Sequence, residues 1–260
     1  MKPKKRIISV ILLIFISWSG SAQIVERDIK ERVGTGFQRT DLHFSLGGGF
    51  AVGGTAPIPM PRSIRQIRSY NPQINLHAEG YLYRRLVGSW GVQTGLRVER
   101  KGMKTRSRVK DYRMEMTADD GAYMEGLWTG DVETRVGNVY LTLPVLATYA
   151  FHKRWQVQAG PYLSVLFYGG FSGAAYNGYL RHHDPTGEKV YVTHASYKFG
   201  PYVRRCAWGA QFGGAYLAST HLCLNANVDW GVSSIFHDSF SAVGFRLFPM
   251  YGRVGAAYMF

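Results

Sequence analysis

The sequence has few cysteines and no long apolar run, and each shortage excludes a class of protein. Only two cysteines, Cys206 and Cys223, occur in 260 residues, which excludes a disulfide framework as the main source of stability. They fall at opposite parity on two expected neighbouring strands, so we expect both thiols to stay unpaired. No apolar run approaches the ~20 residues that a membrane-spanning helix needs. Any membrane crossing must therefore use strands.

Residues 1–22 have the pattern of an export signal. A positive start is followed by the apolar residues 7–16 and by small residues at 19–22; the positive residues are Lys2, Lys4, Lys5 and Arg6. The residue directly after the expected cleavage site is Gln23 and not a cysteine, so nothing indicates a lipid anchor. Residues 23–41 are polar and of mixed charge, which is typical of a flexible periplasmic leader, with a short helix or plug as the alternative. Residues 42–260 remain as one domain.

Acidic residues are scarce as well. Against 31 Lys and Arg there are 17 Asp and Glu, which gives a formal net charge of +14. Loss of the four signal cations would lower this charge to +10. A basic exported protein is suited to anionic lipid headgroups or acidic surface polymers rather than to nucleic acid.

From residue 42 onward, apolar and polar residues alternate in separate segments, as in strands with unlike faces. Each segment is close to the ~9–11 residues that a tilted transmembrane strand needs. The segments are residues 42–50, 74–82, 90–99, 139–149, 155–167, 208–216, 222–230 and 250–260. High glycine and aromatic contents fit the same reading. We predict an all-β fold, a transmembrane antiparallel up-and-down β-barrel of about eight strands.

The connections between these segments alternate between short and long. Short turns are expected to face the periplasm and long loops the outside, and the longest predicted loops are residues 101–137 and 168–205. Trp90 and Trp155 each follow a short turn, as expected of an interfacial aromatic girdle. A soluble sandwich or lipocalin-like barrel is the alternative that strand periodicity leaves open.

Within the long loops, two pairs of segments have strand character of their own. Residues 112–117 and 123–129 flank one turn, and residues 179–182 and 190–194 flank the turn sequence of residues 184–187. We expect both pairs to be hairpins above the membrane. If either pair crossed the bilayer, the strand count would rise to about ten.

The last segment carries the clearest motif. Arg253, Gly255, Tyr258 and Phe260 have a spacing that resembles the C-terminal assembly signal of bacterial outer-membrane barrels. Gly255, Tyr258 and Phe260 are thus expected to engage the barrel assembly machinery. This strand must pair with the first one, because an open sheet edge is unstable in hydrocarbon. The expected location is the bacterial outer membrane.

Residues 95–102, 140–149 and 158–163 resemble the strand motifs of the PorT-like outer-membrane β-barrel family. With the export signal and the last strand, the resemblance covers nearly all of residues 23–260. It implies a barrel fold and, for some members, a part in type IX secretion and gliding. The long loops show no matching motif.

Several charged residues have the parity of the barrel interior: Glu79, Arg97, Asp229 and Arg253. In a barrel of this size side chains fill the lumen, so we expect these residues to form a hydrogen-bonded plug. The expected neutral members are Gln93, Gln156, Gln158, Asn225, Asn227 and His77. A substrate channel or a general porin is the weaker alternative.

A basic run rises out of the third expected strand. It comprises Arg97, Arg100, Lys101, Lys104, Arg106, Arg108, Lys110 and Arg113. Such a run is usually a solvated face, but on the outer leaflet it would meet the phosphates of lipopolysaccharide. We expect lipopolysaccharide contact at Arg106, Arg108 and Lys110.

Two weaker patterns indicate other chemistry. His237 and Ser239 resemble the His-x-Ser of outer-membrane lipid A deacylases, in which the histidine activates the serine, yet no acidic residue follows Ser239 to orient the histidine. Residues 182–184, His-His-Asp, offer a minimal metal shell that His194 could complete across the hairpin, although histidines beside a turn are more often solvated.

Taken together, these patterns favour a non-enzymatic barrel with no cofactor and no metal. Its expected role is that of a scaffold or accessory of a cell-surface or type IX secretion-like machine, or of envelope integrity. Its expected partners are outer-membrane lipid, lipopolysaccharide and other envelope proteins. The alternative is an outer-membrane lipid A hydrolase that uses His237 and Ser239.

Overall fold

The computed structural model describes residues 37, 42–118, 121, 123–182, 184–237, 240, 242 and 244–260. The expected export signal and, apart from Phe37, the expected leader lie outside the described residues. The described chain holds one 11-stranded sheet. The strands are β1 (Leu42–Pro57), β2 (Ile64–Asn71), β3 (Asn75–Val87), β4 (Trp90–Ala118), β5 (Tyr123–His152), β6 (Trp155–Tyr168), β7 (Phe171–Arg181), β8 (Lys189–Lys198), β9 (Cys206–Leu217), β10 (Leu222–Gly231) and β11 (Leu247–Met259). In this part of the chain no helix has the length and hydrophobicity needed to cross a bilayer.

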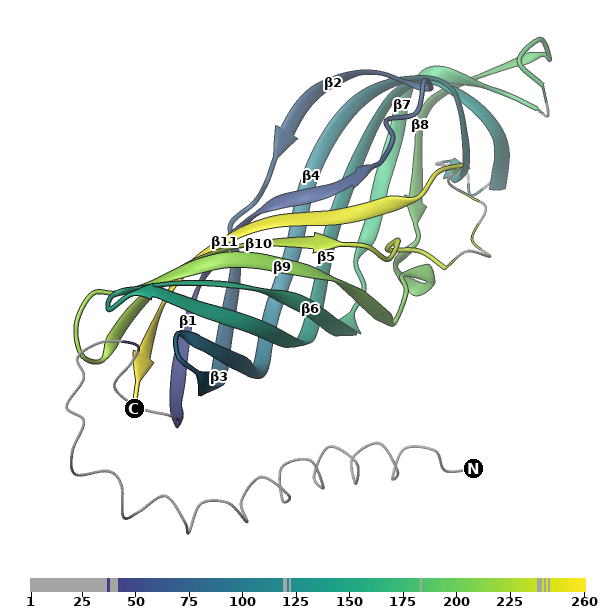
Figure 1. Cartoon of the computed structure of the whole chain (residues 1–260). Helices are drawn as coiled ribbons and strands as arrows, with labels where there is room; N and C mark the ends of the chain where they lie inside the picture. Colours follow the sequence, from purple (N-terminus) through teal and green to yellow (C-terminus); the bar gives the residue numbers. More distant parts are fainter. Residues whose placement is uncertain are drawn as a thin grey trace, which may run out of the picture. The chain divides into compact units, whose positions relative to one another are not determined.

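Eight of the eleven strands, all except β2, β7 and β8, close into an antiparallel ring (Figure 1). The last strand pairs with the first from Ser45↔Met259 to Pro57↔Leu247. This closure confirms the predicted pairing of the C-terminal strand with the first strand. It also leaves the ring with no free edge through the bilayer, where an unpaired backbone would be unstable.

The two faces of the ring are the reverse of those in a soluble protein. Side chains of the outward parity are apolar and exposed, as at Leu46 (56%) and Leu96 (54%), whereas Arg97 and Gln211 on the inward parity are fully buried. A soluble barrel would bury the apolar face instead, so the ring excludes the lipocalin-like alternative. The outward apolar face suits lipid.

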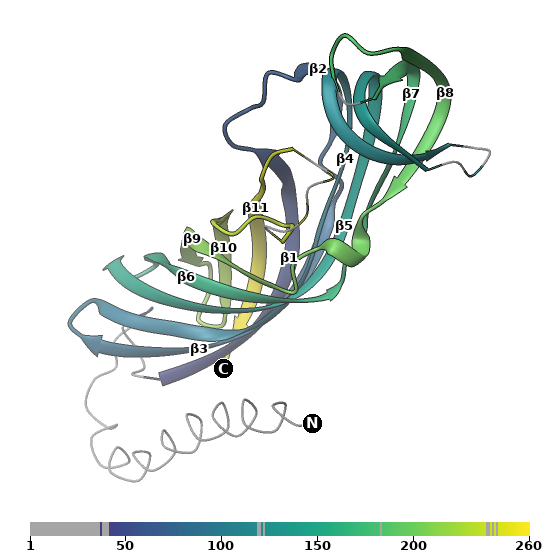
Figure 2. The ribbon, with the colours of Figure 1, turned by 90° about the vertical axis from the view of Figure 1, so that its right-hand side faces the viewer.

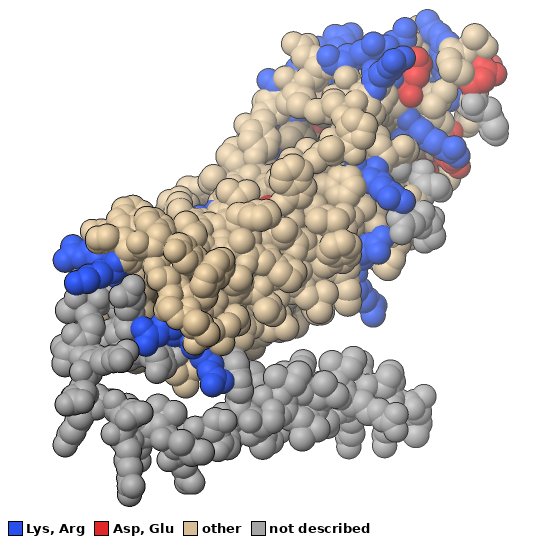
Figure 3. Space-filling view, in the orientation of Figure 1, with Lys and Arg blue, Asp and Glu red and all other residues tan. Residues whose placement is uncertain are grey.

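Short and long connections alternate around the ring as predicted. Tight turns join β3 to β4, β5 to β6 and β9 to β10. At this end the ring of Trp90 packs at a tilt against Tyr149 and that of Trp155 against Tyr216, with ring centroids 4.9 and 4.6 Å apart, as in an interfacial girdle. Figure 3 shows a broad band nearly free of charged side chains, with Lys and Arg gathered at its two ends.

The long outer connections are not loops, and here the sequence prediction was wrong. β4 continues to Ala118 and β5 starts at Tyr123, so most of residues 101–137 is an extended hairpin. Residues 168–205 contain β7 and β8, and the connection after the first strand contains β2. The two predicted loop hairpins exist, with Tyr112↔Trp128 and Tyr179↔Tyr191 as paired residues, and neither adds a strand to the ring.

These strands form a second structure beyond the ring, which we call the outer layer: β2, residues 104–118 of β4, residues 123–136 of β5, β7 and β8 (Figure 2). β7 pairs with β5, β8 pairs with β7, and the pair Thr117↔Ser196 returns β8 to β4. Four strands of the outer layer therefore close on themselves.

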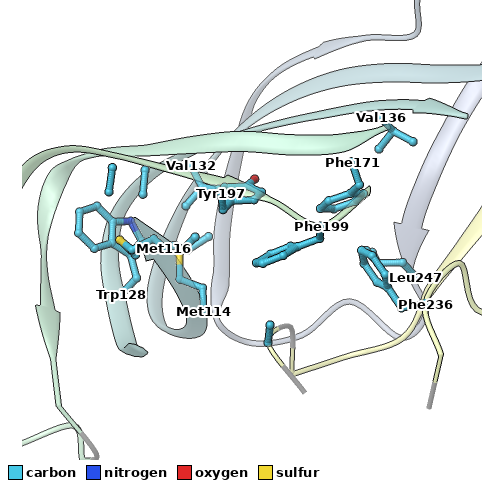
Figure 4. Packing of buried hydrophobic residues seen from close by; sticks show 14 of the residues in the cluster. Met114, Met116, Trp128, Val132, Val136, Phe171, Tyr197, Phe199, Phe236 and Leu247 are labelled. Atoms are coloured by element: carbon cyan, nitrogen blue, oxygen red, sulfur yellow. The ribbon is translucent and has the colours of Figure 1, made fainter. Parts of the chain in front are cut away.

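The outer layer has a larger apolar interior than the ring. Met114, Met116 and Trp128 are almost fully buried there, and Phe171, Tyr197 and Phe199 continue the cluster (Figure 4). The connection from β10 to β11 adds Phe236, whose ring lies 4.8 Å from that of Phe171. Outside hydrocarbon apolar side chains are buried away from water, so the apolar face of these strands is the inward one in the outer layer and the outward one in the ring.

Candidate functional site: the barrel lumen and the cavity above it

The lumen is crossed by ion pairs from four strands. β3, β4, β10 and β11 direct Glu79, Arg97, Asp229 and Arg253 inward. Arg253 Nη1 lies 3.1 Å from Glu79 Oε2, and its Nε lies 2.9 Å from Asp229 Oδ2. Arg97 Nη2 lies 3.1 Å from the same Asp229 oxygen. The structure thus brings the four residues predicted for the lumen into one cluster.

Two further charged residues belong to this cluster and were missed. Glu99 Oε2 lies 3.1 Å from Arg97 Nε, and Glu99 Oε1 lies 3.2 Å from Lys101 Nζ. Lys101 was predicted to belong to the basic surface run, but its side chain is buried. The sequence did contain a signal for both residues. Arg97, Glu99 and Lys101 occupy every second position of β4, so their side chains point to the same face. With both residues included, three cations face three carboxylates and the plug is charge-balanced.

Neutral side chains complete the hydrogen bonding. The Tyr81 hydroxyl donates to Glu79 and accepts from Arg97, at 3.1 Å each. Gln211 Oε1 accepts a hydrogen bond of 2.9 Å from Arg97, and the Thr142 hydroxyl donates one of 2.7 Å to Glu99. Such shared bonds matter because a buried charge without partners is strongly destabilising.

The predicted amide residues lie at the same level or nearer to the short turns. Asn225 Nδ2 donates to Glu79 at 3.1 Å, and Gln158 Nε2 donates to Asn227 at 2.6 Å. A cavity of only ≈30 Å³ remains among these side chains, which is room for about one water. Phe37 lines this cavity and is itself buried. The lumen is therefore a filled interior and not an aqueous pore.

Above the charged cluster, the lumen changes from polar to apolar. The Lys101 ammonium lies 5.0 Å from the ring centroid of Tyr162 and 5.8 Å from those of Tyr140 and Tyr251, within the range of cation–π attraction. Beyond this level is a cavity of ≈390 Å³ lined by residues of β1, β2, β4, β5 and β11 and by Phe171 and Phe245. Its lining is mainly apolar, in contrast to the charged cluster below it.

The residues predicted to contact lipopolysaccharide all lie on the outward face of the outer layer. Arg106, Arg108 and Lys110 are exposed. Arg106 Nε is held 2.7 Å from Glu133 Oε2. Arg108 and Lys110, by contrast, form no ion pair with any described residue. The structure therefore separates one tethered cation from two that are open to an external anion.

Glu133 is the centre of a cationic cluster beyond the apolar band. Lys104 Nζ and Arg135 Nη2 lie 3.1 and 2.6 Å from its Oε1. Burial disfavours the carboxylate, but hydrogen bonds from Arg106, Arg135 and Lys104 outweigh burial and lower the pKa of Glu133 to about 2. The cluster is therefore ionised throughout the physiological range.

The two weaker sequence patterns gain little from the geometry. His237 is exposed and follows the buried Phe236, while Ser239 lies outside the described residues. His194 pairs with Tyr176 in the middle of the hairpin, whereas His182 lies at its turn, beyond the Arg181↔Lys189 pair. The register thus contradicts a metal shell shared by His182 and His194. Within the described residues, no three His, Cys, Asp or Glu side chains gather as a metal site would require.

The two cysteines behave as predicted. Both are free thiols, with Cys206 exposed and Cys223 buried. They lie on β9 and β10, which are neighbours in the ring, but they face opposite sides of the sheet. No disulfide contributes to the described fold.

Sequence comparison then places the chain in a family. Residues 22–237 match the model of the family described as outer membrane protein beta-barrel domain. The chain belongs to this family, and it is a protein of the bacterial outer membrane. A search of curated proteins finds no match.

Among solved structures, the chain is similar to Ail, the attachment invasion locus protein of Yersinia pestis, with 11% identity over 85% of this chain and 100% of Ail and a TM-score of 0.38. It is also similar to the outer membrane protein OprG of Pseudomonas aeruginosa, with 14% identity over 84% of this chain and 95% of OprG and a TM-score of 0.31. At these values the similarities carry no inference about function.

Proposed function

We propose that this chain is a non-enzymatic outer-membrane protein in which a sealed barrel anchors the outer layer, and that the outer layer acts as an accessory or scaffold at the cell surface. The observation that carries the proposal is the charge-balanced plug, with Arg97 and Arg253 completely buried among carboxylates. A sealed lumen argues against solute passage. Of the described chain, the outer layer is then the part that remains for contact with a partner.

The chemistry of the outer layer favours an anionic partner on the outer leaflet. Arg108 and Lys110 are exposed on β4 beside the cluster of Lys104, Arg106 and Arg135. Clustered cations of this kind bind phosphate groups through charge-assisted hydrogen bonds. We infer that lipopolysaccharide phosphates contact Arg108 and Lys110, with Arg106 positioned by Glu133.

The lipopolysaccharide contact is tested by co-purification. Arg108→Gln with Lys110→Gln should lower the amount of lipopolysaccharide retained by the purified barrel. The matched control is Lys153→Gln with Arg154→Gln, which removes the same charge from the turn between β5 and β6 at the opposite end. Equal retention of lipopolysaccharide by both double variants and the parent would refute the inference.

The accessory role is tested in cells. We expect a deletion strain to retain in its periplasm a set of proteins that the parent exports or displays, as the PorT-like resemblance suggests. An unchanged set of secreted and surface proteins, together with altered envelope permeability, would redirect the proposal to envelope integrity. An unchanged set with altered lipid A would instead favour the hydrolase alternative. Ser239→Ala would then abolish the activity, whereas it should leave an accessory function intact.

A further inference from the structure

Neither the sealed barrel nor the basic surface explains the apolar cavity above the charged plug. Its volume is ≈390 Å³, at the lower end of the ~300–1,000 Å³ typical of small-molecule sites. Its walls include Ile67 of β2, Met103 of β4, Val132 of β5 and Met250 of β11. None of the described residues that line it carries a charge.

This composition is unusual for its place in the molecule. Directly below lies the charged plug, and outside the same strands lie Arg106 and Arg108. The inward residues of β4 at this level are small or apolar, namely Met103, Thr105, Ser107 and Val109. An apolar compartment between two strongly charged regions accepts an uncharged hydrocarbon ligand and rejects an ion, since desolvating an ion without a partner is unfavourable.

Beside this cavity the backbone pairing of the barrel wall is interrupted between β1 and β2, where the Tyr70 side chain lies close to Gly54. β1 pairs with β3 only as far as Ala51↔Asn75, and β3 begins at Asn75. Above this row β4 pairs with β2 instead, from Asn71↔Lys104 to Ile64↔Val109. No backbone pairing joins β2 to the outer end of β1 within the described sheet. Residues 53–57 of β1 and residues 64, 67 and 70 of β2 both line the cavity.

The rim of this opening is apolar as well. Ile67 (51%), Tyr70 (50%) and Met60 (52%) are exposed although they line the cavity. Ile74, in the link from β2 to β3, extends the exposed apolar surface toward the lipid-facing side chain of Leu76. Exposed apolar side chains thus lie both at the rim of the cavity and on the neighbouring lipid-facing strand.

We propose that this cavity is a binding site for one uncharged, largely hydrocarbon molecule, which enters between β1 and β2 and stops above the plug. The volume suits a single chain or a small ring system rather than a whole multi-chain lipid. The hydroxyls of Thr105 and Ser107 on the wall offer a hydrogen bond to one polar end. The charged plug prevents passage to the periplasm, so the site binds its ligand without conducting it.

The test uses methionine methyl groups as reporters in the folded protein in lipid nanodiscs. Met60, Met103 and Met250 line the cavity, whereas Met259 lies near the short turns. Titration with decan-1-ol should shift the NMR signals of the three lining methyl groups saturably and leave Met259 unchanged. Decanoate, with the same chain length and a charged end, should bind at least roughly tenfold more weakly because the carboxylate must be desolvated.

Two variants separate the site from general partitioning into the bilayer. Ser107→Trp fills the cavity from β4 and should abolish the saturable shifts. Ile67→Asp introduces a charge at the rim and should weaken binding by at least roughly tenfold. The matched control is Gln66→Asp, which adds the same charge at a neighbouring exposed residue of β2 that does not line the cavity.

The outcomes identify the source of the ligand and decide whether the proposal stands. Contacts between lipid acyl protons and the Met103 methyl group before titration would identify a membrane lipid chain as the occupant. Their absence, with saturable decan-1-ol binding, would identify a free hydrocarbon molecule. Equal shifts of all four methyl groups, or full binding by the Ser107→Trp variant, would overturn the proposal while leaving the accessory function untouched.

Discussion

Removal of Arg97 is the sharpest test of the sealed lumen. The Arg97 side chain is fully buried and contacts Glu99, Asp229, Tyr81 and Gln211 at distances from 2.9 to 3.2 Å. Arg97→Met keeps much of its volume but leaves three carboxylates facing two cations. Breaking a buried ion pair from one side costs about 3–5 kcal/mol, a large share of the roughly 5–15 kcal/mol that stabilises a folded domain.

Urea unfolding in lipid vesicles, followed by tryptophan fluorescence, measures this loss. With a slope of about 1–3 kcal/mol per molar urea, the midpoint should fall by more than about 1 M. Leu96→Met is the control: the neighbouring residue faces lipid, and a volume-conserving exchange there should cost less than about 1.5 kcal/mol. Adding Glu99→Gln to Arg97→Met restores charge balance and should recover part of the loss. Equal midpoints for Arg97→Met and Leu96→Met would refute the reasoning.

Further perturbations address the pore, the outer layer and the thiols. The parent protein should show no open-pore conductance in planar bilayers, and steady porin-like currents would contradict the plug. Trp128→Ala should cost the outer layer about 3–5 kcal/mol, seen as faster proteolysis within residues 104–198 while the ring stays resistant. The ion pairs of Glu133 stabilise the outer layer fully above its ordinary pKa of 4.5, and this stabilisation is lost as the pH falls toward about 2. Glu133→Gln should therefore weaken protease resistance at pH 7 and make no difference near pH 2. A membrane-permeable maleimide should label Cys206 in the folded protein and Cys223 only after unfolding.

The ring could be predicted from the sequence because two environments specify its strands at once. Lipid requires apolar side chains at one parity, and the filled lumen requires polar ones at the other. Leu96 and Arg97 show this contrast at adjacent positions, one exposed to lipid and the other completely buried. All eight predicted segments are strands of the ring for this reason.

The outer layer was hidden because water replaces lipid along the same strands. On β4 the outward positions become Lys104, Arg106 and Arg108, while the inward ones are Thr105 and Ser107. This segment has little apolar contrast and resembles a polar loop. Its strand structure depends on pairing with β5 and β2 and on a core shared with β7 and β8, none of which a local pattern reveals.

For the lumen, parity predicted members of the cluster but not their partners. Glu79 and Arg97 are directly opposite each other in the β3–β4 register, so a simple reading would pair them. Instead the Tyr81 hydroxyl bridges them, while Arg253 reaches Glu79 from β11. The partners follow from how the ring closes, because closure brings β10 and β11 opposite β3 and β4.

Charge balance in the lumen also bears on where function can lie. A channel needs a path on which charged groups remain hydrated, yet here Arg97 and Arg253 are almost completely buried and share Asp229. Opening such a path would require separating buried ion pairs, at several kcal/mol for each. Rearrangement of the outer layer needs no such step, since its charged groups already face water. The binding of partners and ligands on the outer side therefore requires the least change in the structure. Mutations in the plug should lower the stability of the barrel much more than they weaken this binding.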